Sequence, residues 1–202
     1  MAVAFDAEER ARITRSLLQT AERLFAGQGL KKTSLDDLTA PAGIAKTSFY
    51  AFFESKEALY LEVMLRRAPL VAEALAAPLR RQPSADSLSD LMQAMANVLS
   101  TDPLYRRLLT HPEELRAVRR RVRPDEVERI HPVLIAPLLE FVRRGQAEGV
   151  VVGDVPPEVV LDVLGTVGLI VLHRDEYGDS YAQVLAATIR ALGRGLVEGV
   201  TE

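Results

Sequence analysis

The chain has 202 residues, a formal net charge of −3 at pH 7, and 48% hydrophobic against 26% charged residues. This length and balance are typical of a globular protein with a sizeable core, and they argue against a disordered one. The absence of cysteine excludes disulfide frameworks, cysteine zinc sites, iron–sulfur clusters and thiol catalysis. Frequent leucine and alanine, with few aromatic residues and no tryptophan, favour helices over strands. The composition therefore predicts an all-α protein.

No segment is typical of a membrane span or a secretory signal. The most apolar stretch, residues 163–172, is much shorter than the ~20 residues that a membrane helix needs. The first ten residues contain acids and lack an apolar core region. We therefore expect a cytoplasmic protein with no membrane partner. The small net charge does not by itself indicate a nucleic-acid partner.

The first helix is expected to start after Asp6 and to end at Gly27. Asp6 and Glu9 have capping-box spacing, in which side chains satisfy free main-chain N–H groups at a helix start. A longer helix is expected after Ser55, with a kink or break at its prolines. Amphipathic patterns further on predict a larger helical body, with the last two helices over residues 157–173 and 180–197.

Two short helices joined by a glycine turn are predicted over residues 35–52. Ser34 and Asp37 form a second capping box at the start of the first helix. Gly43 suits the turn because glycine takes a positive φ without a Cβ clash. In a helix-turn-helix, the second helix, here residues 45–52, can enter the major groove of DNA. An ordinary helical hairpin has the same pattern, so this spacing leaves both interpretations open.

The second of these helices divides into an apolar and a polar side. Phe49 and Phe53 lie four residues apart and are expected to face inward. Amino and hydroxyl groups are suitable donors to phosphate oxygens, and hydroxyls also reach base edges. Four such residues are left for the outward, groove-facing side: Lys46, Thr47, Ser48 and Tyr50.

Three segments carry a resemblance to a known family: TSLDDL from Thr33, AGI from Ala42, and KTSFYAFFESKEAL from Lys46. With these segments, residues 10–60 resemble the DNA-binding domain of the tetracycline-repressor (TetR) family. The resemblance implies a homodimeric cytoplasmic regulator, usually a repressor that a small molecule releases from its double-stranded DNA operator. It places Lys56 at a phosphate. The residues expected at the DNA-binding site are Thr33, Ser34, Lys46, Thr47, Ser48, Tyr50, Phe52 and Lys56.

The sequence departs from the family pattern at four positions. Thr39 replaces a common alanine, and Pro41 should shorten or bend the first short helix because it lacks an N–H group. Ala45 replaces the usual serine cap of the second helix, which weakens its start by ~1 kcal/mol. Asp36 stands where bases are frequent, so a phosphate contact there is not expected.

We expect residues 1–60 to form the helix-turn-helix domain and residues 61–202 a helical domain for effector binding and dimerisation. The apolar faces of the last two helices predict a four-helix interface between two chains; alternatively, they fill the core of one chain. The effector is expected to be a small, largely apolar molecule. Three polar residues on an otherwise apolar helix, Asp162, Thr166 and His173, are expected to orient it. Alternatively, these residues are core groups that hydrogen-bond within the protein. The predicted effector pocket comprises Leu91, Met95, Leu138, Phe141, Asp162, Thr166 and His173.

Two other functions remain open: a helical enzyme or carrier with an amino-terminal hairpin, and a regulator that has lost DNA binding. No phosphate loop or Ser/His/Asp order is present. Glu128 and His131 match the Glu-x-x-His spacing of di-iron bundles, but such sites need two copies. No catalytic residue, metal or cofactor is therefore expected. A run of arginines fits an anion or DNA patch, although a solvated or ion-paired helix face is favoured: Arg116, Arg119, Arg120, Arg121 and Arg123.

Overall fold

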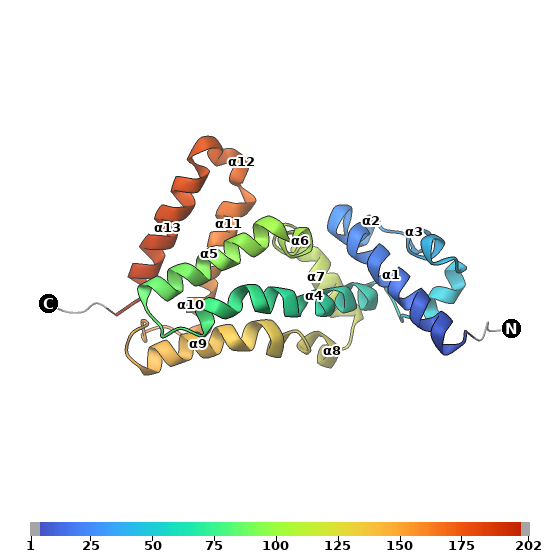
Figure 1. Ribbon diagram of the computed structural model, residues 1–202, viewed down its shortest axis with the longest axis horizontal. Helices are drawn as coiled ribbons and strands as arrows, with labels where there is room; N and C mark the ends of the chain where they lie inside the picture. Colours follow the sequence, from blue (N-terminus) through green and yellow to red (C-terminus); the bar gives the residue numbers. More distant parts are fainter. Residues whose placement is uncertain (1–4, 199–202) are drawn as a thin grey trace. The chain divides into compact units, whose positions relative to one another are not determined.

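The computed structural model describes residues 5–198, apart from the side chain of Val127. This part of the chain is helical and contains no β-strand, which confirms the all-α prediction (Figure 1). A single isolated bridge joins Val151 and Val197 within it. The chain folds into two compact units. The first comprises the residues up to Arg67 together with Pro103–Arg129, and the second comprises Ala68–Asp102 and the residues from Ile130 onward.

The first unit is organised around the long amino-terminal helix α1 (Ala7–Gly27). Asp6 caps this helix as predicted, because its Oδ1 accepts a hydrogen bond of 2.8 Å from the Glu9 N–H group. The buried face of α1 includes Ile13, Leu17 and Phe25. The other elements are α2 (Gly29–Lys32), α3 (Leu35–Thr39), the 3₁₀ helices η1 (Ala40–Ala42) and η2 (Lys46–Ala51), the first part of α4 (Lys56–Leu79), α6 (Pro103–Thr110), α7 (Pro112–Arg121) and α8 (Pro124–Glu128).

The second unit is a helical body whose core lies between α5 and its neighbours. Leu88, Leu91 and Met92 of α5 are fully buried, and α5 packs against α10, α11 and α13. The elements after α4 are α5 (Ala85–Thr101), the π-helical turn η3 (His131–Ile135), α9 (Ala136–Ala147), α10 (Pro157–Gly165), α11 (Val167–Leu172), α12 (Arg174–Tyr177), the 3₁₀ turn η4 (Gly178–Ser180) and α13 (Tyr181–Gly195).

The compact units do not divide the chain at residue 60, where the functional division was expected. Helix α6 packs against α1, and α7 packs against α2, so Pro103–Arg129 belongs to the same compact unit as the amino-terminal helices. The functional division into residues 1–60 and 61–202 stays a prediction. The boundary inside α4 follows Arg67, two residues before Pro69, which has no N–H group for the helical ladder.

Two predictions about the helices are affected by the structure. Helix α4, expected to kink or break at its prolines, runs through Pro69 and Pro78 without a break. The helix predicted over 157–173 is two helices, because α10 ends at Gly165 and Thr166 donates its hydroxyl to the Val163 carbonyl at 2.6 Å. A side chain that bonds to the preceding turn competes with the helical ladder and favours a bend.

Most residues expected at a dimer interface on the last helices are buried within one chain. These are Val160, Leu164, Val167, Val171, Leu185, Ile189 and Leu196. They fill the core of the second unit, as the alternative interpretation proposed. On the same helices, Val159 and Leu169 remain exposed. None of the helices in the described residues combines the length and the apolar character that a membrane span requires.

Candidate nucleic-acid interface

The turn of the predicted helix-turn-helix has the expected geometry. Gly43 lies in the left-handed region, with φ at 70° and ψ at 27°. Its N–H group donates to the Ala40 carbonyl at 3.1 Å, and the Ile44 N–H group donates to the Thr39 carbonyl at 3.3 Å. Other residues adopt this backbone conformation only at an energetic cost. Gly43 therefore allows the chain to reverse between α3 and η2, as the sequence predicted.

The capping box at the start of α3 is also confirmed. The Ser34 N–H group donates to Asp37 Oδ2 at 2.8 Å, and the Asp37 N–H group donates to Ser34 Oγ at 3.1 Å. The side-chain hydrogen bond with Ser34, and then the main-chain bond from the same residue, lower the pKa of Asp37. Ser34, expected at DNA, thus has an intramolecular role at the helix start.

The second helix of the motif differs from the prediction. Residues 45–52 were expected to be α-helical, but η2 is a 3₁₀ helix without a side-chain cap at Ala45. A short uncapped segment with a β-branched residue has little intrinsic helix stability, and 3₁₀ geometry is common in such pieces. In a 3₁₀ helix, residues three apart lie on one side. Thr47 and Tyr50 therefore share a face, and both are exposed, Tyr50 to 61%.

The inward side of η2 is apolar, as predicted. Phe49 is fully buried, and its ring contacts those of Tyr50 and Phe53 at centroid distances of 5.6 and 6.0 Å. Phe52 is half-buried, and its ring lies beneath the Arg10 guanidinium at 5.0 Å. Arg10 also donates to the Ala51 carbonyl at 2.6 Å. This arginine, which sequence reasoning missed, fixes the end of η2 to α1.

Lys46 and Ser48 complete the predicted outward set on η2. Ser48 is half-buried, whereas Lys46 is exposed and pairs with Asp36, with 3.1 Å between Nζ and Oδ2. The sequence identified Asp36 only as a poor phosphate contact. In the structure, its carboxylate forms an ion pair with Lys46, one of the cations that the motif would offer to DNA.

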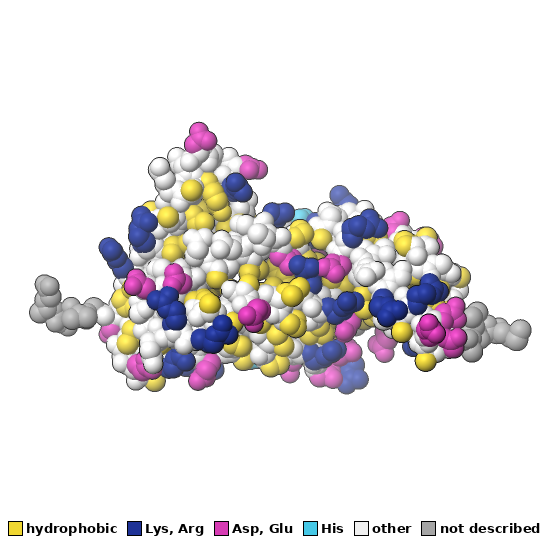
Figure 2. Space-filling model, viewed as in Figure 1, with side chains coloured by type: hydrophobic (Ala, Val, Ile, Leu, Met, Phe, Trp, Pro, Cys, Tyr) yellow, Lys and Arg dark blue, Asp and Glu magenta, His cyan; other side chains and the backbone are white. Residues whose placement is uncertain are grey.

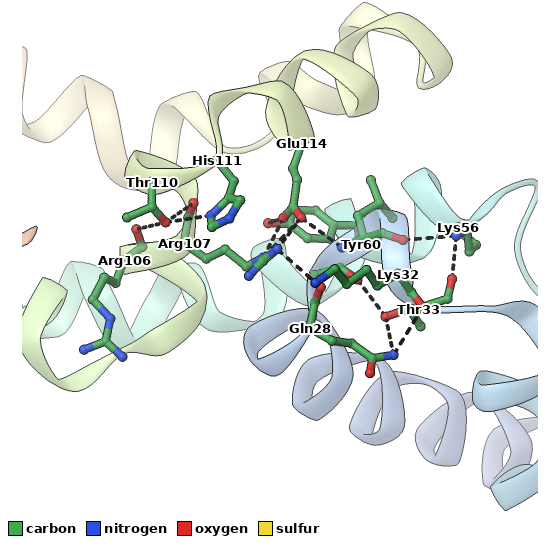
Figure 3. Close-up of polar contacts among 12 residues, drawn as sticks. Gln28, Lys32, Thr33, Lys56, Tyr60, Arg106, Arg107, Thr110, His111 and Glu114 are labelled. Carbon is green, nitrogen blue, oxygen red and sulfur yellow. Dashed lines mark hydrogen bonds and ion pairs between the residues drawn. The ribbon is translucent and has the colours of Figure 1, made fainter.

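Thr33 and Lys56 lie at the α1–α2 corner (residues 27–33), not on η2. Thr33 is buried, and its hydroxyl donates to the Gly29 carbonyl at 2.7 Å. The Lys56 ammonium donates to the Leu30 carbonyl at 3.0 Å and to the Thr33 carbonyl at 2.5 Å (Figure 3). Both side chains therefore hold the main chain of the corner in the unbound protein.

A buried ion pair from α6 and α7 closes on the same corner. Arg107 and Glu114 are 16% and 5% exposed, with 2.9 Å between Nη2 and Oε1. Arg107 also donates to the Gln28 carbonyl at 3.3 Å, and Glu114 accepts from the Leu30 N–H group at 3.1 Å (Figure 3). Gly29, with φ at 83°, lies beneath the pair, where a Cβ atom would overlap both side chains.

Tyr60 of α4 completes this arrangement from below the corner. Its hydroxyl donates to Glu114 Oε2 at 3.4 Å, and its ring packs on Phe25 with 5.1 Å between centroids. Burial, followed by the charge of Glu114, raises the pKa of Tyr60, so its hydroxyl stays protonated. Sequence reasoning missed the contact of this pair with the corner, because Glu114 and Leu30 lie 84 positions apart.

Comparison with known proteins finds a family match in the helix-turn-helix segment. The family model described as "Bacterial regulatory proteins, tetR family" matches residues 17–63, which contain the turn and η2. The HTH-type transcriptional regulator EthR of Mycobacterium tuberculosis is 43% identical over 51 residues, which are 25% of this chain and 24% of EthR. Residues 17–63 therefore match the amino-terminal segment of the TetR family, and this match does not extend to the rest of the chain. The match spans about a quarter of the length of these curated relatives.

Solved TetR-family structures share the fold over nearly the whole chain. A transcription regulator from Marinobacter aquaeolei aligns with a TM-score of 0.71 and 18% identity, covering 96% of this chain and all of that one. FadR from Bacillus subtilis, solved with stearoyl-CoA, aligns with a TM-score of 0.66 and 15% identity, covering 90% of this chain and 98% of FadR. At these identities, the likeness shows the fold alone.

Two of the departures from the TetR-family pattern have visible structural consequences. Helix α3 ends at Thr39, and Pro41 lies in the 3₁₀ turn that follows, as its missing N–H group predicted. Ala45 gives η2 no side-chain cap. The turn and the buried Ala42 that supports it are retained, so these changes alter the two short helices without removing the motif.

One residue of the predicted effector pocket lines a described cavity. A cavity of about 340 Å³ lies between α4 and α9 in the second unit, and Phe141 is the predicted residue that lines it. Leu91 and Leu138 are buried, and Met95 is half-buried. Asp162, Thr166 and His173 are exposed, and His173 Nδ1 lies 2.9 Å from Glu176.

The remaining candidate groups are the Glu-x-x-His residues and the arginine run. Among the described residues, no three His, Asp or Glu side chains gather closely enough to hold a metal ion. His131 and Glu128 are both exposed. Within the arginine run, Arg123 forms a bidentate pair with Asp125, whereas Arg120 lines a cleft beside the α1–α2 corner.

Proposed function

We propose that this chain is a DNA-binding transcriptional regulator that presents η2 to the major groove. The observation that carries the proposal is the exposed face of Thr47 and Tyr50, supported on a glycine turn within the TetR-family segment. Both side chains carry hydroxyl groups that bond to phosphate oxygens or base edges. EthR, which shares this segment, is by its name a transcriptional regulator of the helix-turn-helix type. A regulator of this kind acts in the cytoplasm.

The protein is proposed to act as a homodimer on a palindromic operator. Leu169 on α11 is 59% exposed and Val159 on α10 is 42% exposed, and Figure 2 shows further apolar side chains on the lobe that carries α11 and α13. A second copy would cover these side chains. A two-fold symmetric pair would carry two reading helices, and half-sites spaced by about whole turns of DNA would match them.

A small, largely apolar effector is proposed to bind the cavity between α4 and α9 and to release the protein from its operator. The cavity has the size of a small-molecule site. Its walls include Leu75 and Leu79 of α4 and Phe141 of α9. Arg144 lies beside them, and its buried Nε has no hydrogen-bond partner among the described residues. An effector with one acceptor group would suit this nitrogen. FadR, solved with stearoyl-CoA, offers an example of a ligand with a long apolar acyl chain on this fold.

Fluorescence anisotropy with the DNA upstream of the protein's own coding sequence tests the central proposal. We expect the parent to bind this DNA with higher affinity than a scrambled duplex. We expect Thr47→Ala to bind the two duplexes with equal affinity. Circular dichroism of the variant should match the parent, because Thr47 is exposed and makes no described hydrogen bond. Equal affinity of the parent for both duplexes would contradict sequence-specific regulation.

Light scattering of the parent and of Leu169→Asp tests the dimer. A parent that is already monomeric at micromolar concentration contradicts it.

A further inference from the structure

The first unit contains a second cleft whose ligand the proposed function does not account for. It has a volume of about 570 Å³, within the range of small-molecule sites. Its walls come from the α1–α2 corner, the first turn of α4, the end of α6 and α7. All of these elements belong to the first compact unit. Figure 3 shows several of the polar side chains around it.

Positive charge exceeds negative charge around this cleft. Five Lys and Arg residues line it against three Glu residues, although the whole chain has a net charge of −3. The charge of Glu114 is balanced by Arg107. Lys56 donates to two carbonyl oxygens, so no carboxylate balances its charge among the described contacts. Among described residues, Lys31, Lys32 and Arg120 likewise have no ion pair, which leaves four cations against Glu57 and Glu113.

The wall of the cleft also offers a fixed donor. The Nε and Nη2 atoms of Arg107 are held by Glu114 and the Gln28 carbonyl. The third nitrogen of the guanidinium, Nη1, makes none of the described hydrogen bonds and is not fully buried. The ion pair therefore fixes a guanidinium whose side chain is 16% exposed and whose Nη1 has no partner among the described contacts. Guanidinium donors on rigid supports are well suited to carboxylate and phosphate oxygens.

We propose that this cleft binds a small molecule bearing carboxylate or phosphate groups. Arg107 Nη1 donates to one of its oxygens, and Lys31, Lys32 and Arg120 supply the surrounding charge. The ligand would lie against the α1–α2 corner, where Lys31 and Lys32 are exposed and line the cleft. Its binding therefore lowers the affinity for DNA by neutralising positive charge there; this last consequence alone rests on the proposed function.

Histidine-ring NMR on the full chain, without DNA, tests the site directly. The probes are inorganic pyrophosphate and citrate at fixed pH, against sodium chloride at equal ionic strength. His111 lines the cleft, whereas His131 and His173 belong to the second unit and serve as internal references. We expect a saturable shift of the His111 ring alone with at least one probe. The more tightly bound probe identifies phosphate or carboxylate as the preferred group. Absence of a saturable His111 shift with both probes would overturn the proposal.

A matched pair of variants locates the binding charge. Arg120 and Arg119 are exposed neighbours on α7, but of the two only Arg120 lines the cleft. We expect Arg120→Gln to raise the Kd of the probe by about tenfold, as for loss of one charge-assisted contact, and Arg119→Gln to leave it unchanged. An equal loss in both variants would show diffuse attraction and overturn the site. Because no DNA is present, these results stand whether or not the protein proves to be a DNA-binding regulator.

Discussion

The η2 helix and the α1–α2 corner use their polar side chains in different ways, although residues of both were expected at DNA. On η2, Thr47 and Tyr50 are exposed and make no side-chain hydrogen bond among the described residues. At the corner, Thr33 and Lys56 donate to main-chain carbonyls. One motif thus contains side chains that are free for a ligand and side chains that hold the backbone. Mutations should separate the two groups, because the first should change DNA affinity alone and the second should change stability as well.

The largest effect is expected from Glu114→Ala. The substitution leaves the half-buried Arg107 guanidinium without its partner and leaves the Leu30 N–H group and the Tyr60 hydroxyl without their acceptor. Loss of one member of a buried ion pair costs about 3–5 kcal/mol. Urea denaturation followed by circular dichroism should show this decrease in the free energy of unfolding. Glu113→Ala, at an exposed neighbouring position, should change it by less than about 0.5 kcal/mol. Similar values for the two variants would mean that the pair does not stabilise the corner.

Tyr50→Ala should weaken operator binding and leave stability nearly unchanged. Loss of a base or phosphate contact at η2 is expected to cost about 1–3 kcal/mol, roughly ten- to hundredfold in Kd. Anisotropy titration with the operator measures this change, and thermal denaturation checks the fold. Tyr50→Phe keeps the ring that packs edge-on against Phe49 and removes only the hydroxyl. If Tyr50→Phe binds as the parent does while Tyr50→Ala does not, the ring and not the hydroxyl carries the contact.

Lys56→Gln should lower stability and DNA affinity together. The Lys56 ammonium makes two hydrogen bonds to carbonyls of the corner, and a glutamine amide is uncharged and on a shorter side chain. We expect a loss of about 1–2 kcal/mol in the free energy of unfolding, since hydrogen bonds from charged donors contribute about 1.5–3 kcal/mol. Lys31→Gln, at an exposed position of α2, is the control for loss of charge alone. A variant with parental stability, reduced affinity and a salt slope smaller by about one would assign Lys56 to a phosphate instead.

The features predicted correctly from the sequence are those that depend on near neighbours. The capping box of Ser34 and Asp37 and the turn at Gly43 need only residues within a few positions. The 3₁₀ form of η2 was missed because the pattern of Phe49 and Phe53 fits an α-helix as well. The contacts of Arg107 and Glu114 with the corner could not be predicted, since Gln28 and Leu30 are distant from both residues in sequence.

The exposed residues of the predicted effector pocket differ from these features, because the sequence already indicated their position. Asp162 and Thr166 lie four positions apart, so helical spacing places them together on one face. The buried residues Val160, Leu164, Val167 and Val171 lie on the other face. This periodicity was available in the sequence and indicates an outward polar stripe rather than groups inside a pocket. Placing Phe141 beside Leu75 and Leu79, in contrast, required the packing of α9 against α4.

The smallest expected effect has the opposite sign and comes from Asp36→Asn. Asp36 and Lys46 form an exposed pair, with side chains 67% and 54% exposed, and such pairs stabilise proteins by only about 0–1 kcal/mol. If Lys46 contacts the DNA backbone, as proposed, a phosphate would compete with Asp36 for the same ammonium group. Removing the carboxylate should therefore raise DNA affinity by roughly two- to fivefold at low salt, and the gain should shrink as salt screens the charges. Anisotropy titrations at two salt concentrations measure it. In a Lys46→Gln background the same substitution should give almost no gain, because the competition that it relieves is already absent. An equal gain in both backgrounds would show that Asp36 acts through its general repulsion of DNA and not by occupying Lys46.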